Sequence, residues 1–311
     1  MRGYLLRHWR GEMSLTRSFW INHELLGLVA WLLFSLGPAD EESSILADLG
    51  WFWLPMPFLA AMSVWQVVGT WRSARRTVRE RGRWFWPRLA QSWLVVGVAG
   101  LLGAASLQTM ASVQLVEALL DPGLNEFHLI ADEVEGALIF HGALSDRAAD
   151  RLTAVIGDGR YSVLHIDSHG GLLGPAKRIA REIRQHGTKV VVQDQCISAC
   201  VYLLAASRFG TIRPDSDVVF HQLQPVVTLF ASYQPGFPVA DEDFLRELGV
   251  KPATYCPLDR RAFWQPTLRQ MANGRLIAFV IDPDTGRQTP AYVWCLDHAE
   301  ACDAPRWAPT D

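Results

Sequence analysis

The chain has 311 residues, half of them hydrophobic, and a formal net charge of −3. A charge this close to neutrality provides no basic field of the kind that binds nucleic acid, so we expect no nucleic-acid partner. The basic residues nevertheless crowd the first third of the chain and the acidic residues gather later, an asymmetry that indicates a membrane protein.

Three apolar stretches, at residues 21–37, 51–71 and 92–112, follow an N-terminal tail at 1–20. A helix that crosses the hydrocarbon of a bilayer needs roughly 20 mostly apolar residues, and the second and third stretches meet this length without a charged residue. The first stretch has an apolar core of only residues 25–36, and it qualifies only when Trp20 and Ile21 are included. Buried core helices are the alternative, but tryptophans flank the stretches as they do at membrane interfaces. We predict a transmembrane region of three helices over 21–112.

The arginines predict the orientation. The segment 72–91, between the second and third stretches, holds seven of them, and the tail adds Arg2, Arg7, Arg10 and Arg17, whereas the segment between the first two stretches has acids and neither Lys nor Arg. The positive-inside rule then places the N-terminus and segment 72–91 in the cytoplasm. Three crossings put the rest of the chain on the far side, so we expect a multi-pass inner-membrane protein with a periplasmic C-terminal domain. The stretches "GEMSLTRSFW" and "VWQVVGTWRSARR" also resemble a small multi-span module that precedes various bacterial domains.

All five cysteines follow the predicted spans, in the compartment where disulfides form. Cys196 and Cys200 are four residues apart, and Cys295 and Cys302 are seven apart, so each pair is a candidate disulfide, and Cys256 is the candidate for the odd thiol. A zinc site is the alternative, but the sequence has no Cys-x-x-Cys pair, and we expect no metal.

After a linker at 113–130, strand-like apolar runs alternate with helix-like amphipathic ones, a pattern typical of an α/β domain with a largely parallel sheet. We place this domain at 131–285, followed by a cysteine-containing tail at 286–311. The predicted strands are 136–142, 162–168, 188–193 and 216–222. The predicted helices are 145–159, capped by Ser145, 174–187, with Pro175 in its first turn and Gly187 at its end, and 197–207.

Function in such sheets collects where strands end in loops. Gly170 and Gly171 follow one predicted strand, Ser198 follows another at the first turn of a helix, and His221 ends a third. A hydroxyl, an imidazole that can take its proton, and N–H donors from a glycine turn are what acyl transfer requires. Each feature has a simpler explanation: Ser198 as a helix N-cap, His221 as a structural histidine, and the glycines as an ordinary turn. The glycines lack the spacing of a dinucleotide-binding loop, so we expect no cofactor.

The stretches "LHIDSHGGLLGPAKRIAREIR", "QDQCISACVYLLAAS" and "RPDSDVVFHQ" together resemble the proteolytic subunit of the Clp protease, ClpP, and its crotonase-fold relatives. The resemblance covers residues 136–222 and implies a spiral of β-α-β units. The C-x-S-A-C arrangement at 196–200, with the later stretch "FWQPTLRQM", is more similar still to uncharacterised exported bacterial proteins of this superfamily. The resemblance implies that Ser198 is the nucleophile, His221 the general base, and the N–H groups of Gly171, beside Gly170, and Ala199 the oxyanion donors.

The sequence departs from the family at several positions. His169 replaces the usual proline, and the two cysteines replace small residues around Ser198. Arg261 stands where the third catalytic residue, a carboxylate, is expected. Asp259 is then the nearest candidate, and the stretch Asp241, Glu242 and Asp243 is the fallback.

The leading hypothesis is a membrane-anchored serine peptidase that cuts peptides or membrane proteins outside the cytoplasm, as a homo-oligomer in the lipid bilayer. A catalytically silent ClpP-like scaffold that oligomerises and binds partners is the second hypothesis, favoured by Arg261. A crotonase-like acyl-CoA enzyme is the third, and it leaves Ser198 and His221 unexplained. A Cys196–Cys200 bridge would stiffen the turn that carries Ser198.

Overall fold

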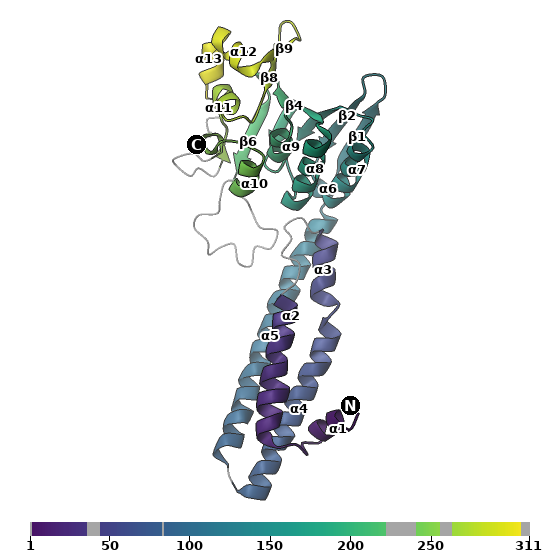
Figure 1. Cartoon of the computed structure of the whole chain (residues 1–311), viewed down its shortest axis with the longest axis vertical. Helices are drawn as coiled ribbons and strands as arrows, with labels where there is room; N and C mark the ends of the chain where they lie inside the picture. Colours follow the sequence, from purple (N-terminus) through teal and green to yellow (C-terminus); the bar gives the residue numbers. More distant parts are fainter. Residues whose placement is uncertain (1, 36–43, 83, 222–240, 256–262, 306–311) are drawn as a thin grey trace. The chain divides into compact units, whose positions relative to one another are not determined.

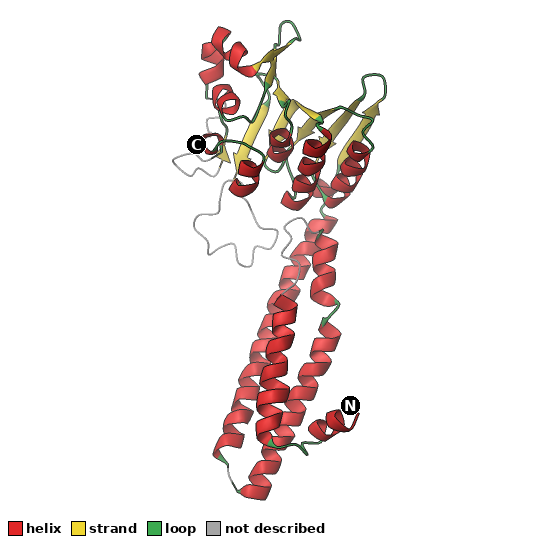
Figure 2. Cartoon of the chain, in the orientation of Figure 1, coloured by secondary structure: helices red, strands yellow, loops and turns green. Residues whose placement is uncertain are grey.

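The computed structural model describes residues 2–35, 44–82, 84–221, 241–255 and 263–305. The chain divides into two compact units, Met1–Val113 and Gln114–Asp311. The first unit is helical and the second is a mixed α/β unit (Figures 1 and 2).

The first unit is built on two long apolar helical runs. Ile45–Arg81 and Phe85–Leu120 are both long and apolar enough to cross a membrane. The helices of this part of the chain are α1 (Arg2–Trp9), the π-helical segment η1 (Arg17–Leu25), α2 (Leu26–Ser35), α3 (Ile45–Trp53), α4 (Met56–Arg81) and α5 (Phe85–Leu120). The predicted stretches 51–71 and 92–112 lie within these two runs, and α5 continues into the predicted linker.

The first predicted stretch, 21–37, differs from the expectation of three spanning helices. Its described part divides into the end of η1, which includes His23 and Glu24, and the ten residues of α2. A π-helical turn changes the helical register, and the polar residues in it interrupt the apolar run. The described residues therefore contain two candidate membrane helices rather than three.

Buried polar contacts hold the N-terminal residues of the first unit. Asn22 accepts a hydrogen bond from the Tyr4 hydroxyl at 2.6 Å, and its Nδ2 lies 2.9 Å from Nδ1 of His8. The hydroxyls of Ser18 on η1 and Ser73 on α4 lie 2.9 Å apart. These contacts fix α1 and η1 against α4, because buried polar groups are stable only when they are paired.

The second unit is organised around a sheet with the strand order β1-β2-β3-β4-β5-β8-β9, and β6 pairs with both β4 and β7. Strands β2 to β6 and the β5–β8 pair are parallel, whereas β1, β7 and β9 pair antiparallel with their neighbours. The strands are β1 (Phe127–Asp132), β2 (Ala137–Gly142), β3 (Val163–Ser168), β4 (Lys189–Ile197), β5 (Thr211–Ile212), β6 (Asp217–His221), β7 (Phe263–Trp264), β8 (Phe279–Ile281) and β9 (Gln288–Pro290). Four of them, β2, β3, β4 and β6, correspond to predicted strands.

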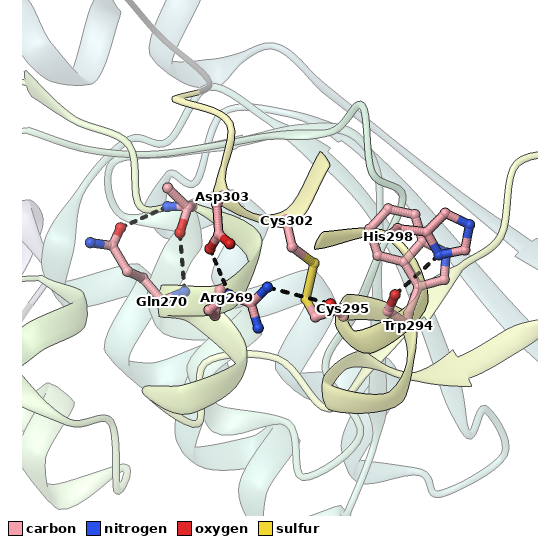
Figure 3. Close-up of a disulfide and its surroundings, with 8 residues drawn as sticks. Arg269, Gln270, Trp294, Cys295, His298, Cys302 and Asp303 are labelled. Carbon is pink, nitrogen blue, oxygen red and sulfur yellow. Dashed lines mark hydrogen bonds and ion pairs between the residues drawn. A yellow bond between two sulfur atoms is a disulfide. The ribbon is translucent and has the colours of Figure 1, made fainter. Parts of the chain in front are cut away.

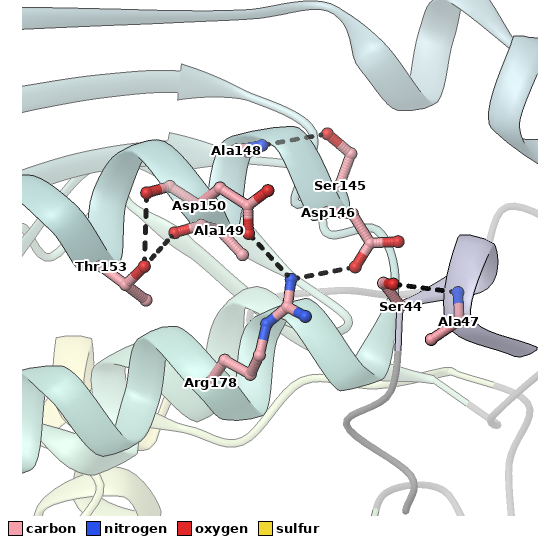
Figure 4. A network of polar contacts seen from close by, with 9 residues as sticks. All are labelled: Ser44, Ala47, Ser145, Asp146, Ala148, Ala149, Asp150, Thr153 and Arg178. Carbon is pink, nitrogen blue, oxygen red and sulfur yellow. Dashed lines mark hydrogen bonds and ion pairs between the residues drawn. The ribbon is translucent and has the colours of Figure 1, made fainter.

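Three helices, α7 (Asp146–Gly157), α8 (Leu173–His186) and α9 (Cys200–Ala206), cover one face of this sheet (Figure 2). The predicted ends are confirmed for two of them: the Ser145 hydroxyl accepts from the N–H of Ala148, and Gly187 ends α8 in the left-handed region. Arg178 on α8 links the first two helices through ion pairs with Asp146 at 2.9 Å and Asp150 at 3.6 Å (Figure 4).

Strand β4 changes neighbours along its length, and this change positions the candidate site. Its first half pairs with β5 through Val191, and its second half, Gln195–Ile197, pairs with β6. On the other side, its register with β3 shifts between Ile166 and Ser168, so that Ser168 pairs with Cys196. The end of β4 therefore lies between the ends of β3 and β6.

The structure extends beyond the predicted elements at both ends of the second unit. Strand β1 lies largely within the predicted linker and pairs with β2. Towards the C-terminus the structure has short elements where the sequence showed mainly loops: α10 (Glu242–Glu247), η3 (Pro252–Thr254), α11 (Leu268–Asn273), α12 (Ala291–Asp297) and α13 (Ala299–Asp303), with α6 (Pro122–Asn125) near the start of the unit.

A disulfide joins Cys295 on α12 to Cys302 on α13, with the Cα atoms 5.5 Å apart (Figure 3). Arg269 of α11 contacts both ends of this loop, through an ion pair with Asp303 at 2.6 Å and a hydrogen bond to the carbonyl of Cys295 at 3.4 Å. The hydrogen bond to Arg269 is the main cause that lowers the pKa of Asp303.

Candidate functional site

Ser198 lies in the turn between β4 and α9 and has φ 58°. A non-glycine residue in the left-handed region is uncommon and costs energy, so it persists only where the surrounding structure enforces it, and such residues cluster at functional sites. The helix N-cap is Ala199, which makes no side-chain capping bond, and α9 begins at Cys200. Ser198 is therefore not the N-cap of α9, and capping does not explain why a serine stands there.

Gly170 packs directly against Ser198. A Cβ atom added to Gly170 would lie 2.6 Å from Cβ of Ser198 and 2.7 Å from the carbonyl oxygen of Ile197, and its φ of 100° already favours glycine. The tertiary structure thus brings the predicted glycine turn and the predicted serine together, although 28 positions of sequence separate them. Only a glycine fits this approach.

Ser168, which the sequence analysis did not single out, organises the glycine turn. Its buried hydroxyl donates to the carbonyl of Gly142 at 2.6 Å and accepts from the N–H of Gly170 at 3.1 Å. This contact occupies the Gly170 donor. Within the described part of the chain, the N–H groups of Gly171 and Ala199 donate to no backbone carbonyl, so these two are the candidate oxyanion donors.

His221 ends β6, the strand beside the end of β4. The N–H of Ser198 donates to the carbonyl of Val219 at 2.8 Å, and His221 follows Val219 by two residues. His221 itself pairs with Phe263 of β7, and their ring centroids lie 5.8 Å apart. The structure therefore places the serine and the histidine at the ends of adjacent paired strands.

The candidate acids fall into two groups. Asp259, together with Arg261, lies outside the described residues. Asp241 caps α10 by accepting from the N–H of Phe244 at 3.0 Å, and its carboxylate forms an ion pair with the buried Lys177. Asp243 forms an ion pair with Arg246 at 2.7 Å, and Glu242 lies in the first turn of α10. Asp241 is thus engaged by the ion pair with Lys177 and by the cap of α10.

A second disulfide spans the serine turn. Cys196 and Cys200 are bonded, with the Cα atoms 5.2 Å apart, and both residues are fully buried. Cys196 belongs to β4 and Cys200 to the first turn of α9, so the bond joins the two elements between which Ser198 is held. Both expected pairs are thus found, and Cys256 lies outside the described residues.

Other polar residues occupy the same sheet without forming a metal centre. Nδ1 of His141 on β2 lies 2.8 Å from the Asp167 carboxylate on β3, where the two residues are cross-strand partners. Among the residues that the structure describes, no three His, Cys, Asp or Glu side chains are grouped so as to hold a metal ion.

No protein-family model matches the sequence, and no curated protein matches it. Among solved structures, a similarity is found to a point mutant of ClpP1 from Listeria monocytogenes, with 13% sequence identity and a TM-score of 0.38. The match covers 49% of this chain and 95% of that chain. A similarity of this size does not transfer an activity, a substrate or a partner.

Proposed function

We propose that the protein is a membrane-anchored serine peptidase of the ClpP type that acts outside the cytoplasm on peptides or membrane proteins. The observation that carries the proposal is the left-handed conformation of Ser198, which lies between a strand and a helix and against Gly170. A serine held there by close contacts, and not used as a helix cap, has a stereochemical cost that a structural role does not explain.

In the proposed reaction, the Ser198 oxygen attacks the scissile carbonyl carbon while His221 takes the hydroxyl proton. The oxygen of the tetrahedral intermediate accepts hydrogen bonds from the N–H groups of Gly171 and Ala199. The intermediate collapses with cleavage of the C–N bond, and His221 gives its proton to the leaving amine. Water, deprotonated by His221, then hydrolyses the acyl-enzyme and restores the serine.

The topology of the proposal follows from the two long helical runs and the arginines between them. Arg72, Arg75, Arg76, Arg79 and Arg81 lie in the last three turns of α4, so the positive-inside rule puts this end in the cytoplasm. Helix α5 then returns the chain to the other side. The two disulfides in the second unit support this assignment, because disulfides persist in oxidising compartments. A third crossing by residues 21–37 affects only the side of the N-terminus.

The test is labelling of the full-length protein with a fluorophosphonate probe, which reacts with activated serine hydroxyls. We expect labelling of the wild type, no labelling of Ser198→Ala, and normal labelling of Ser162→Ala, which removes an exposed hydroxyl of the same unit. A reporter fused to the C-terminus determines its side of the membrane separately. Equal labelling of the wild type and Ser198→Ala would remove the serine from the mechanism.

A catalytically silent scaffold is the second candidate, favoured by the ion pair that engages Asp241 with Lys177 and by Arg261 at the expected acid position. Without a carboxylate that orients the histidine, the rate of a serine hydrolase falls by about 10⁴. Both candidates predict a folded homo-oligomer, so the probe distinguishes them. If the protein is a scaffold, the oligomer is not labelled, and if it is a peptidase, the oligomer is labelled.

A further inference from the structure

The first unit has a tryptophan-lined cavity of about 710 Å³ between η1 and the beginning of α5. Three of its lining residues are the exposed tryptophans Trp20, Trp86 and Trp93, and one is the carboxylate residue Glu24. The remaining lining residues are Leu15, Thr16, Phe19, Leu89 and Ala90. Apart from Thr16, the other lining residues are aromatic or aliphatic, and a carboxylate among them calls for an explanation, because charged groups are costly in apolar surroundings.

Glu24 is held in place by its neighbours. The indole N–H of Trp93 donates to its Oε1 at 2.8 Å, and Nδ1 of His23 lies 3.1 Å from the same oxygen. Both contacts use Oε1, so neither of them occupies Oε2. About a third of the Glu24 side chain, 32%, remains exposed. The carboxylate is thus fixed and still accessible.

Tryptophan rings beside a fixed carboxylate have the chemistry of an ammonium-binding site. The face of an indole ring attracts cations, and a carboxylate adds a full opposite charge. An anionic headgroup would be repelled by Glu24, and an acyl chain by itself would have no use for a carboxylate. The charge and the aromatic lining of the cavity are therefore complementary to a cationic group, rather than to an anionic or an uncharged one.

The position of the cavity favours a lipid. On the proposed topology, Trp86 and Trp93 lie at the cytoplasmic end of α5, at the level where lipid headgroups meet the hydrocarbon, and Trp20 lines the same cavity from η1. Leu15, Leu89 and Ala90 provide an aliphatic lining for the beginning of an acyl chain. Arg17 and Arg88 stand next to the lining residues Thr16 and Leu89 in sequence, so the two segments that form the cavity also carry positive charge.

We propose that this cavity binds a phospholipid whose headgroup carries an ammonium group, with Glu24 pairing the ammonium and the tryptophan rings enclosing it. The proposal rests on the membrane anchoring in the proposed function, and not on the peptidase activity. The lipid would fix η1 to α5 at the cytoplasmic side of the unit.

The experiment uses the full-length protein purified in detergent and given equal amounts of phosphatidylethanolamine, its N-acetylated form and phosphatidylglycerol. Native mass spectrometry counts the lipid retained. N-acetylation removes the positive charge and leaves the phosphate and the chains, so the ratio of amine to acetylated lipid reports the ammonium alone. We expect the wild type to prefer the amine form about tenfold, the effect of one cation–π contact combined with an ion pair.

Glu24→Gln is the main variant, because the amide oxygen can still accept the indole hydrogen bond of Trp93. It should bring the ratio close to one, and Trp20→Leu should lower it about threefold. Glu80→Gln, which removes a carboxylate on α4, and Trp31→Leu, which removes an exposed tryptophan on α2, are the matched controls and should keep the wild-type ratio.

Three results would overturn the proposal: a ratio of one in the wild type, an unchanged ratio in Glu24→Gln, or displacement of the amine lipid by an equal concentration of a lysine-containing peptide, which would make the cavity a peptide site. Resistance of each variant to alkaline extraction from membranes reports the anchoring independently. Probe labelling at Ser198 reports the peptidase independently. A failure of the lipid site is therefore distinguishable from a failure of the proposed function.

Discussion

The backbone N–H of Ser198 donates to the carbonyl oxygen of Val219 at 2.8 Å. This bond continues the pairing of β4 with β6 by one residue beyond Ile197, at the point where the chain turns towards α9. It fixes the serine turn to the strand that ends, two residues later, in His221. The pairing of β4 with β6 therefore determines how Ser198 and His221 are placed relative to each other. A change in the serine turn should reduce probe labelling at Ser198 before it affects the rest of the fold.

Gly170→Ala should abolish probe labelling and destabilise the protein. The added methyl would lie 2.6 Å from Cβ of Ser198, a distance that real Cβ atoms do not adopt, so the serine turn must shift. Gly159→Ala is the matched control, because Gly159 also has a positive φ, of 68°, but has nothing within 4 Å of the added atom. It should cost only about 1 kcal/mol of backbone strain and keep the labelling. Thermal unfolding and labelling are measured on both variants, and equal labelling of the two would contradict the contact.

The two disulfides should contribute similarly to stability and differently to labelling. The loops they close have sequence separations of 4 and 7, for which loop-closure entropy gives about 2 kcal/mol each. The double variant Cys196→Ala and Cys200→Ala should therefore unfold at lower denaturant and also label more slowly, because the serine turn loses its link between β4 and α9. The double variant Cys295→Ala and Cys302→Ala should lose similar stability with normal labelling. Equal labelling rates in the two variants would assign a purely structural role to the Cys196–Cys200 bond.

The number of membrane crossings determines the side of the N-terminus. If residues 21–37 cross the bilayer, as the sequence analysis expects, the N-terminus and the C-terminus lie on opposite sides. If only the two long helical runs cross, both termini lie on the extracytoplasmic side. Epitope tags at the two ends, tested for protease accessibility in spheroplasts, give the answer. We expect a protected N-terminal tag and an accessible C-terminal tag, because η1 packs through Ser18 against Ser73 in the arginine-rich end of α4, which the proposed topology places in the cytoplasm. Two accessible tags would reduce the anchor to two crossings.

The stability of the second unit should decrease when the pH falls below about 6.5, the ordinary pKa of histidine. Burial lowers the pKa of His165 in the folded protein, with Glu135 opposing and Lys189 adding to the effect. The unfolded chain then binds a proton that the folded chain does not, so the contribution of His165 is fully present above its unfolded pKa and is lost as the pH falls.

The comparison for this pH dependence is between His165→Gln and His186→Gln. His165→Gln should flatten the dependence of the melting temperature on pH between about pH 7 and 5. His186→Gln, which removes a histidine at the end of α8 that pairs with Glu182 at the surface, should keep most of the wild-type slope, because a surface ion pair contributes little to stability. A wild-type slope in His165→Gln would show that another group titrates.

Much of the second unit could be predicted from local sequence patterns. The β-branched and apolar runs of β2, β3, β4 and β6 were recognisable because a buried strand needs such residues along most of its length. Ser145 and Gly187 marked helix ends because a cap bond and a left-handed residue are requirements of a single position. The strands β5 and β7, with two residues each, carry no periodic pattern and are defined only by the neighbours with which they pair.

Local patterns were enough to place particular residue types at the ends of the strands: a diglycine, a serine between two cysteines, and a histidine. The folded chain was needed to establish that Ser198 precedes α9 in a left-handed turn and that Gly170 touches it. It also showed that Ser168 occupies the Gly170 N–H, which leaves Gly171 and Ala199 as donors. Propensity and periodicity report on a few neighbouring residues in the sequence, so they do not reveal contacts between distant strands. These contacts join β3, β4 and β6, and the three strands meet because β4 changes its pairing partner along its length.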